Sequence, residues 1–364
     1  MKIHSNRLIP ISKPQIGRAE RLAVSRVMKS GQIAQGSEVL EFEKEFSAYV
    51  DQRACVAVNS GTSALHIALL SLGIGAGDEV IVPSFTFAAT ANSVVLAGAK
   101  PVFVDVQSDT FCVDPTEIEK AITVHTKAIV VVHLYGLPSD MLRILDIAAK
   151  HNLKVIEDAA QAHLAEIRGK TVGTFGDAAA FSFYPTKNMT SGEGGMVAFK
   201  EDTSARTARL LRNQGMEKRY ENEIVGFNLR MNNIQAAIGR VQLRKLPERN
   251  EKRQENAIFL NQRLSGLVRI PFIPDGFTHV FHQYTIQVAG ERQRYVDFLR
   301  EQGIETGIYY PTPVHRLKPF SRDITLPITD SLSKKVLSLP VHPGLKRKDL
   351  IRVASAVSEA CQRS

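Results

Sequence analysis

One lysine, Lys187, has neighbours that suit covalent chemistry with a carbonyl group. It follows the apolar stretch 181–184 and precedes a glycine-rich stretch over residues 192–195. A lysine that is partly removed from water has a lowered pKa, and its neutral amine attacks carbonyl carbon atoms. The commonest place for a lysine is the solvated surface, and these neighbours alone leave that alternative open.

Two adjacent acids, Glu157 and Asp158, follow a second apolar pattern over residues 153–156. On a strand, neighbouring side chains point to opposite faces, so only one of the two carboxylates can face a site shared with Lys187. A carboxylate at one strand end and an amine at another suit a site that binds a protonated heterocycle and forms an imine with it. The alternatives for Asp158 are a helix cap or a surface position.

Residues 59–65, with the sequence NSGTSAL, are typical of a strand–turn–helix junction. The first backbone N–H groups of a helix have no internal partner and carry positive partial charge. Gly61 allows an anion to approach closely, and the hydroxyls of Thr62 and Ser63 add donors. This pattern predicts a phosphate-binding turn. A plain serine N-cap explains the same residues and stays open as an alternative.

A glycine-rich loop and three histidines have less specific patterns. Residues 73–77 precede the strand pattern that begins at Glu79, whereas a dinucleotide-binding loop follows a strand, so nicotinamide binding is not predicted. His279 and His282 would diverge on a strand, and we expect no metal site. His315 follows two prolines in a rigid loop bordering the cleft, where a structural role is the simpler interpretation.

The elements that must position these residues alternate along residues 52–200. Helical patterns over residues 63–72, 115–122 and 141–151 separate strand patterns over 79–83, 101–105, 128–132 and 154–156, and further strand patterns follow over 178–183 and 196–200. This alternation predicts right-handed crossovers and a largely parallel sheet covered on both faces. Ligands of such sheets bind at the carboxyl ends of the strands, and Asp158 and Lys187 follow two of these ends.

The second part of the chain has a different rhythm. A long helical pattern covers residues 232–260, after which strand and helix patterns resume over 283–288, 294–302, 307–310 and 348–361. We therefore expect two domains, a large one over residues 1–245 and a smaller α+β domain over residues 246–364, with the boundary in or near the long helix.

Bulk composition excludes several classes of protein. The net charge of +9 is scattered, and because aromatic–basic recognition modules are absent we expect no nucleic-acid partner; an anionic small substrate explains the charge equally well. Cys55, Cys112 and Cys361 lack metal-type spacing. No apolar run approaches the ~20 residues of a membrane span, and residues 1–7 lack the apolar core of a signal peptide. A cytoplasmic protein is expected.

Taken together and in this order, these motifs resemble the DegT/DnrJ/EryC1/StrS family of sugar aminotransferases, which use pyridoxal 5′-phosphate. The resemblance covers nearly the whole chain. It implies the α/β class and the type I, aspartate-aminotransferase-like fold, with a mostly parallel seven-stranded sheet and a smaller α+β C-terminal domain. The matching stretches are residues 31–33, 59–64, 83–90, 132–136, 157–163, 181–195, 226–237 and 310–315.

The resemblance implies roles for single residues. Lys187 matches the lysine that forms an imine with the cofactor, and Asp158 matches the acid that pairs with the pyridine nitrogen. Gln161 matches the residue near the cofactor's phenolic oxygen, and Phe87 matches the aromatic residue that stacks on the ring. The phosphate-binding positions are matched by Thr62, Ser63 and Ser182, beside Gly61.

The resemblance also implies a homodimer with shared active sites. Asn228 looks like the residue that reaches the phosphate from a second subunit, and Arg230 either does the same or contacts substrate. The positions expected to contact substrate are His163, Arg230, Tyr310 and His315.

The implied activity is transfer of an amino group from an amino acid, L-glutamate by family analogy, to a nucleotide-linked keto-sugar in amino-sugar biosynthesis, for a lipopolysaccharide or an antibiotic sugar. Residues 190–195 look more like members that aminate carbon 4 of the sugar than carbon 3. Two alternatives remain: a dehydratase of the same fold, although family dehydratases carry histidine in place of Lys187, and a regulatory member without turnover.

Overall fold

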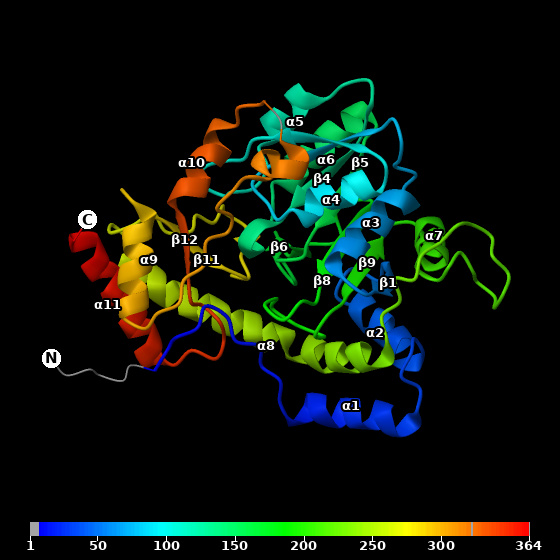
Figure 1. Cartoon of the computed structure of the whole chain (residues 1–364), viewed down its shortest axis with the longest axis horizontal. Coiled ribbons are helices and arrows are strands. Elements are labelled where there is room, and N and C mark those ends of the chain that lie inside the picture. The colour runs from blue at the N-terminus through cyan, green and yellow to red at the C-terminus, as the bar shows by residue number, and fades with distance from the viewer. Residues whose placement is uncertain (1–6, 322, 364) are drawn as a thin grey trace.

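The computed structural model describes residues 7–321 and 323–363, and residues 1–6, on which most of the signal-peptide argument rests, lie outside them. A seven-stranded sheet forms the centre, in the order β1-β9-β8-β5-β4-β2-β3 (Figure 1). β9 is antiparallel to both of its neighbours, and the other pairs are parallel. The predicted mostly parallel sheet is confirmed. Its strands are β1 (Ala54–Val58), β2 (Glu79–Pro83), β3 (Lys100–Val104), β4 (Thr126–Val132), β5 (Lys154–Asp158), β8 (Ala178–Ser182) and β9 (Gly195–Phe199).

Helices cover both faces of this sheet because alternate strand residues point to opposite sides. On one face, Val80, Val130 and Ile156 pack with α3 (Gly61–Ser71), α4 (Ala89–Leu96) and α7 (Asp202–Arg212). On the other face, Ile129 and Val155 pack with α5 (Pro115–Ala121) and α6 (Met141–His151). The rest of that face packs against α2 (Ser37–Ser47) and the beginning of α8 (Asn233–Leu264).

A second hydrophobic core packs against the second half of α8. Figure 1 shows α8 as one long helix that runs from the helices beside the central sheet to α9 (Arg292–Glu301) and α11 (Arg347–Gln362). Leu243 of α8 belongs to the sheet-side core, whereas Leu260 belongs to the second core. Ile9 also joins the second core and pairs with Ile304, a contact that the division at residues 245/246 does not anticipate. The second core contains α9, α11 and the antiparallel pair β11 (Tyr284–Gln287) and β12 (Val336–Leu339).

Some short segments differ from the prediction. Residues 307–310, for which a strand or helix pattern was expected, form neither, because only Gly307 pairs with β12, through Ser338. Other short elements were not predicted. α1 (Arg18–Ser30) packs on α8, with Val27 against Val241. The remaining elements are β6 (Glu166–Ile167), β7 (Lys170–Thr171), β10 (Phe277–Thr278), α10 (Pro327–Lys335) and the 3-10 turns η1 (Leu134–Gly136), η2 (Val314–Arg316) and η3 (Lys318–Phe320). None of the described helices is both long and apolar enough to cross a membrane.

Candidate active site

The carboxylate of Asp158 is held at the carboxyl end of β5 and lies away from bulk water. Its Oδ2 accepts a hydrogen bond from the Thr90 hydroxyl at 2.8 Å, and its Oδ1 accepts one from the Ala160 N–H at 3.3 Å. Burial raises the pKa of Asp158, although Thr90, Ala160 and the charge of Lys187 act in the opposite direction. A poorly solvated carboxylate of this kind gains most from a cationic partner.

Lys187 lies in the loop between β8 and β9 and is half-buried. Burial lowers the pKa of its amine from 10.5 to about 8, and the carboxylate of Asp158 partly opposes this effect. The two groups therefore lie close enough for the charge of each to affect the pKa of the other. An amine with this pKa is partly neutral near physiological pH and can act as a nucleophile and as a general base.

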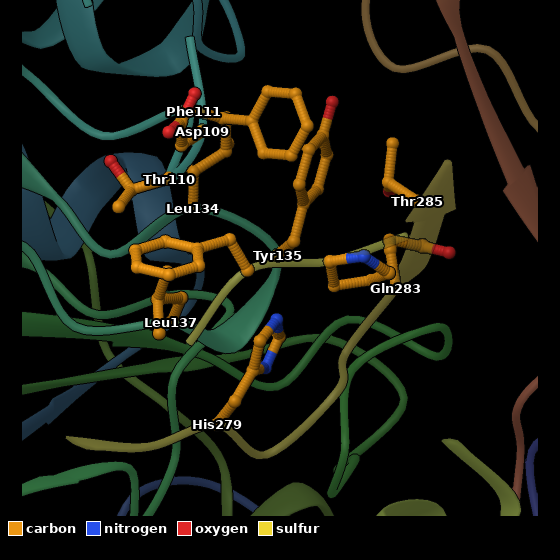
Figure 2. A pocket seen from close by; sticks show the side chains of 11 residues that line it. Asp109, Thr110, Phe111, Leu134, Tyr135, Leu137, His279, Gln283 and Thr285 are labelled. Carbon is orange, nitrogen blue, oxygen red and sulfur yellow. The ribbon is translucent and has the colours of Figure 1, made fainter. Parts of the chain in front are cut away.

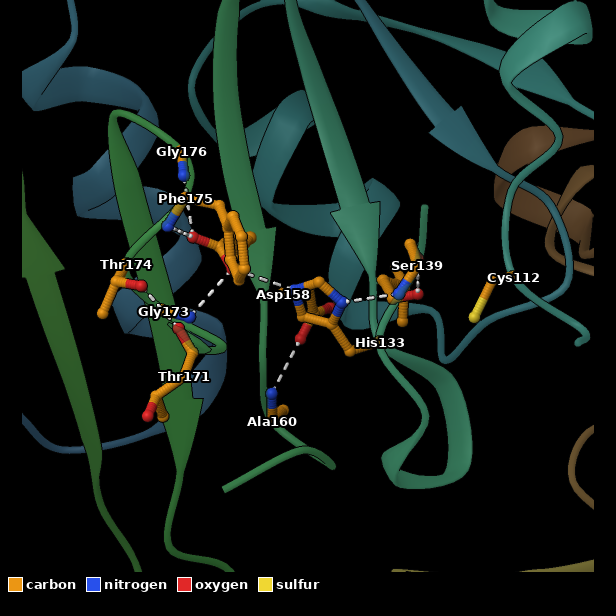
Figure 3. A network of polar contacts seen from close by, with 12 residues as sticks. Cys112, His133, Ser139, Asp158, Ala160, Thr171, Gly173, Thr174, Phe175 and Gly176 are labelled. Atoms are coloured by element: carbon orange, nitrogen blue, oxygen red, sulfur yellow. Dashed lines mark hydrogen bonds and ion pairs between the residues drawn. The ribbon is translucent and has the colours of Figure 1, made fainter. Parts of the chain in front are cut away.

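Glu157, the neighbour of Asp158, points to the other face of the sheet and has a structural role. Its carboxylate accepts three hydrogen bonds of 2.8–2.9 Å from the N–H groups of Gly173, Phe175 and Gly176, three residues of the turn that Figure 3 labels. His133 Nε2 lies 3.1 Å away and donates, because Nδ1 accepts from the backbone N–H of Ser139. Burial acts to raise the pKa of Glu157, but His133 and the N–H groups outweigh it and lower the pKa.

The beginning of α3 forms a turn against the end of β8. A Cβ atom added to Gly61 would lie only 2.7 Å from the Cβ of Ser182, so a glycine is required for this close approach. Ser60 is the N-cap, since its hydroxyl accepts from the Ser63 N–H at 3.1 Å. The hydroxyl of Ser63 donates to Asn59 at 2.7 Å, while Thr62 is partly exposed. The serine cap is thus present, and the anion-binding role of this turn stays a prediction.

Gln161 joins this edge of the sheet to the segment that carries Tyr310. Its Oε1 accepts from the backbone N–H of Tyr135 at 2.7 Å, and its Nε2 donates to the Tyr310 hydroxyl at 3.0 Å. One amide hydrogen of Gln161 remains for a further acceptor. The ring of Phe87 lies 5.9 Å from that of Tyr310, centroid to centroid, and is 58% exposed. An aromatic face this exposed at the mouth of a site is suited to cover a flat ligand.

Tyr135 fixes the segment that carries Tyr310. Its hydroxyl donates to the backbone carbonyl of Tyr309. Figure 2 shows its ring between Phe111 and Thr285, beside a small cavity that separates the 109–111 loop from β11. Tyr135 was not predicted, and neither was Thr90, because residue type alone does not reveal such contacts.

Of the other predicted site residues, His163 lies close enough to Lys187 for that charge to help burial lower the pKa of its imidazole to about 3. Its ring is buried between those of Phe181 and Phe183, with centroids 5.5 and 5.9 Å away, a placement that favours packing over direct contact with substrate. His315 is fully buried, and its Nδ1 lies 2.6 Å from the Ser84 hydroxyl, which favours the structural interpretation. Asn228 and Arg230 lie on the outer edge beyond β1, where Arg230 pairs with Val58 and Asn228 is exposed.

His279 and His282 lie in a loop rather than on a strand. The ring of His279 stacks on Phe281 at 4.0 Å between centroids, and Nδ1 of His282 lies 3.3 Å from the side-chain oxygen of Asn188. Across residues 7–321 and 323–363, no three His, Cys, Asp or Glu side chains gather as a metal site.

Residues 14–358 match the model of the DegT/DnrJ/EryC1/StrS aminotransferase family. The chain belongs to this family. It is 43% identical over 363 residues to GDP-perosamine synthase of Caulobacter vibrioides. The alignment covers 96% of this chain and 98% of the relative. It is 41% identical over 338 residues to a UDP-N-acetyl-3-dehydro-alpha-D-glucosamine 3-aminotransferase of Acidithiobacillus ferrooxidans, covering 92% and 91%. It is 42% identical over 356 residues to a protein of Geobacillus stearothermophilus named pleiotropic regulatory protein, covering 95% and 94%.

Solved structures agree over nearly the whole chain. DesV of S. venezuelae, crystallised with a ketimine intermediate, has a TM-score of 0.92 and 40% identity and covers 95% of both chains. A sugar aminotransferase of Streptococcus pneumoniae in its PLP form has a TM-score of 0.94 at 27% identity, covering 98% of this chain and 99% of that one. These similarities confirm the predicted fold class.

The residues present fit a phosphorylated aromatic aldehyde with a basic ring nitrogen. Asp158 offers a buried carboxylate for a cationic ring, and Lys187 offers an amine of lowered pKa for the aldehyde. The helix start at Gly61 and the hydroxyl of Ser182 offer neutral donors for a phosphate. Phe87 offers an exposed aromatic face.

Proposed function

We propose that this enzyme transfers an amino group from L-glutamate to a keto-sugar carried on a nucleoside diphosphate, with pyridoxal 5′-phosphate as cofactor. When bound, the cofactor supplies an electron sink for the carbon atom that exchanges its proton. The observation that carries the proposal is the amine of Lys187, with a pKa lowered to about 8, coupled to the buried carboxylate of Asp158.

The residues of this chain divide the work by charge and position. The anionic Asp158 keeps the ring nitrogen protonated, because a buried carboxylate favours a neighbouring cation. Lys187 takes a proton from the reacting carbon and returns one as its conjugate acid, which a group titrating near pH 8 does effectively. Phe87 and Tyr310 cover the reacting groups against water, and Gln161 presents its free amide hydrogen.

We propose that the active site is completed by a second copy of this chain. Asn228 is exposed on the outer edge of the molecule, while Arg230 donates from Nη1 to Asn213 at 2.9 Å and lies opposite Val58, two residues before the N-cap of α3. Side chains on such an edge are available to the phosphate of a neighbouring subunit. The net charge of +9 suits the diphosphate of the substrate.

For the position of amination we propose carbon 4 of the sugar, on the strength of residues 190–195. The Acidithiobacillus relative, whose name places its reaction at carbon 3, makes carbon 3 the second candidate. The test is a panel of nucleotide-linked 3-keto- and 4-keto-sugars with glutamate as donor. The aminated product is detected by mass spectrometry, and its substituted carbon is assigned by NMR.

The same panel separates the alternatives. A dehydratase releases water and consumes no glutamate. A regulatory protein, the role named for the Geobacillus relative, shows no turnover at all. Reduction with borohydride is expected to attach the cofactor permanently to Lys187, which peptide mass spectrometry locates. If Lys187→Ala retains the visible absorbance band and the activity, the catalytic assignment is wrong.

A further inference from the structure

A small hollow lies beside the loop that carries Lys187, between residues 12–15, that loop and the second half of α8. Its basic side chains come from Lys13, Lys187, Arg249 and Arg253, and its hydroxyl side chains come from Ser12, Thr186 and Thr190. Its volume of ≈ 300 Å³ includes open solvent, so only a compact group would fit. It shares Lys13 and Arg249 with a wider groove of ≈ 1610 Å³, which connects it to the surface.

Arg253 is a buried cation that the described residues leave without a carboxylate. Only 5% of it is exposed, and its Nη1 donates to the carbonyls of Phe281 at 3.0 Å and His282 at 3.4 Å. Its Nε has no hydrogen-bond partner within the described part of the chain. Burial and repulsion by Arg249 lower the pKa of Arg253 to about 10. A buried charge without a counter-charge is costly, so an anion would stabilise this arrangement.

Arg249 also forms no ion pair with a described residue, although the charges of Glu20 and Glu248 act to raise its pKa. Arg249 contacts the Gln242 side chain and donates from Nη2 to the Gln15 carbonyl at 3.0 Å, both neutral partners. Lys13 forms no ion pair with any residue that the structure describes. Glu20, whose charge acts on Arg249, accepts from Lys245 and from Gln242, each at 2.7 Å. The acids Glu248, Glu251 and Glu255 line only the outer groove.

We propose that Lys13, Arg249 and Arg253 form a binding site for one phosphate or carboxylate group. The two guanidinium groups and the ammonium supply charge-assisted donors, and Thr186 and Thr190 add hydroxyls at the same hollow. The group comes either from a free inorganic anion or from an anionic part of a substrate that enters along the outer groove. The binding site exists whatever reaction the enzyme catalyses.

The test is thermal unfolding of the cofactor-loaded enzyme in sodium phosphate, with ionic strength held constant by sodium chloride. Loading keeps inorganic phosphate out of the cofactor's own phosphate site. Phosphate at 20 mM is expected to raise the Tm of the wild type by roughly 2 °C and to leave Arg253→Met unchanged. Lys13→Met, on the exposed amino-terminal segment, is a second variant in case Arg253→Met does not fold.

The matched control is Lys252→Met, which removes a positive charge from the residue of α8 that directly precedes Arg253. Lys252 lines the outer groove but not the hollow, and it pairs with Glu255 at 2.6 Å. This variant is expected to keep the full rise in Tm. The proposal fails if phosphate gives the wild type no rise, or if Arg253→Met and Lys13→Met both rise as much as the wild type does.

A second arm identifies the source of the anion. A nucleoside diphosphate or glutarate is added at saturation before the phosphate titration of the wild type. If the added compound removes the phosphate-dependent rise, the substrate supplies the group in this hollow. If the rise persists in wild type and Lys252→Met but not in Arg253→Met, the hollow takes free inorganic anion.

Discussion

At Lys187, burial and the carboxylate of Asp158 act on the pKa in opposite directions. Burial is the larger effect, so the pKa falls from 10.5 to about 8, and Asp158 prevents it from falling further. The neutral amine, the form that the proposed role of Lys187 requires, therefore becomes the major form above about pH 8.

We predict that the rate at which the cofactor-free enzyme captures pyridoxal 5′-phosphate rises with pH and is half-maximal near pH 8. In Asp158→Asn the negative charge is lost, the pKa of Lys187 falls further, and the midpoint moves to lower pH. Stopped-flow absorbance measures both profiles. An unchanged midpoint in Asp158→Asn, or a wild-type midpoint near 10.5, would contradict the coupling between the two groups.

Tyr135 acts on the site through Tyr309 and Gln161 rather than by contact with the reacting atoms. Its hydroxyl binds the Tyr309 carbonyl, and its backbone N–H orients Gln161, which in turn donates to Tyr310. Both contacts constrain Tyr310, which we propose to cover the reacting groups. Tyr135 is therefore a positioning residue.

Tyr135→Phe is expected to lower the free energy of unfolding by about 1–2 kcal/mol, because the Tyr309 carbonyl loses its donor. It is also expected to lower kcat roughly tenfold, because Tyr310 is held less firmly over the reacting groups. The control is Tyr284→Phe, which loses a 2.7 Å bond to Asn261 inside the second core and should keep its kcat. Equal losses of kcat in both variants would indicate a general effect of destabilisation.

Residues whose chemistry is local could be predicted from the sequence. Lys187 and Asp158 each follow an apolar strand pattern, and Gly61 lies in a strand–turn–helix junction. The sequence therefore gives both the residue type and its place at the end of a predicted strand. Thr90 and Tyr135 could not be found in this way. Thr90 meets Asp158 across 68 positions of the chain, and Tyr135 meets Gln161 across 26, so their roles depend on the folded topology.

At the scale of elements, the turn over residues 173–176 is fastened to β5 by the side chain of Glu157. Three backbone N–H groups and His133 donate to one buried carboxylate, and Asp158 is the next residue along the same strand. The network therefore fixes the strand end from which Asp158 reaches the site (Figure 3).

Glu157→Gln is expected to lower the free energy of unfolding by about 3 kcal/mol at pH 7. The amide has only one acceptor oxygen, and its NH2 group would face backbone N–H donors that the second carboxylate oxygen accepts in the wild type. The control Glu255→Gln, on the exposed side of α8, should change it by less than ~0.5 kcal/mol. Urea unfolding at several pH values measures both effects.

The pH dependence of this loss has a definite sign. The pKa of Glu157 is lowered in the folded protein from 4.5. Its contribution is thus complete above about pH 4.5 and disappears as the pH falls through the lower, folded pKa. The difference between wild type and Glu157→Gln should shrink in that acidic range, and a constant difference would contradict an ionised Glu157.

Elements with a clear period were predictable, whereas very short ones were not. The buried strand β4 and the helix α8 have sequence patterns that extend over most of their lengths. The strands β6, β7 and β10 contain two residues each, too few for any alternation to appear. The placement of Ile9 in the second core depends on pairing with Ile304, far along the chain, and no local pattern announces it.

At the scale of the whole molecule, the residues of the proposed site lie in different regions of one chain. Lys187 and Asp158 are coupled at the carboxyl edge of the sheet, whereas Asn228 is exposed on the outer edge beyond β1. If Asn228 serves a neighbouring subunit, each site of a homodimer takes Lys187 from one chain and Asn228 from the other. Defects in these two residues can then be separated between chains.

We predict that Lys187→Ala and Asn228→Ala homodimers are both impaired, the first completely, and that mixing them restores activity. In a mixed dimer one site carries both defects and the other carries neither. Random pairing makes half of the dimers mixed, with one intact site of two, so about a quarter of wild-type activity should return after denaturation and refolding of an equimolar mixture. Thr203→Ala, in the exposed first turn of α7, replaces Asn228→Ala in a control mixture. There the activity should equal the share of Thr203→Ala chains, about half, and not exceed it.

If the Lys187→Ala and Asn228→Ala mixture shows only the sum of its separately refolded components, Asn228 acts within its own chain and the shared site is excluded.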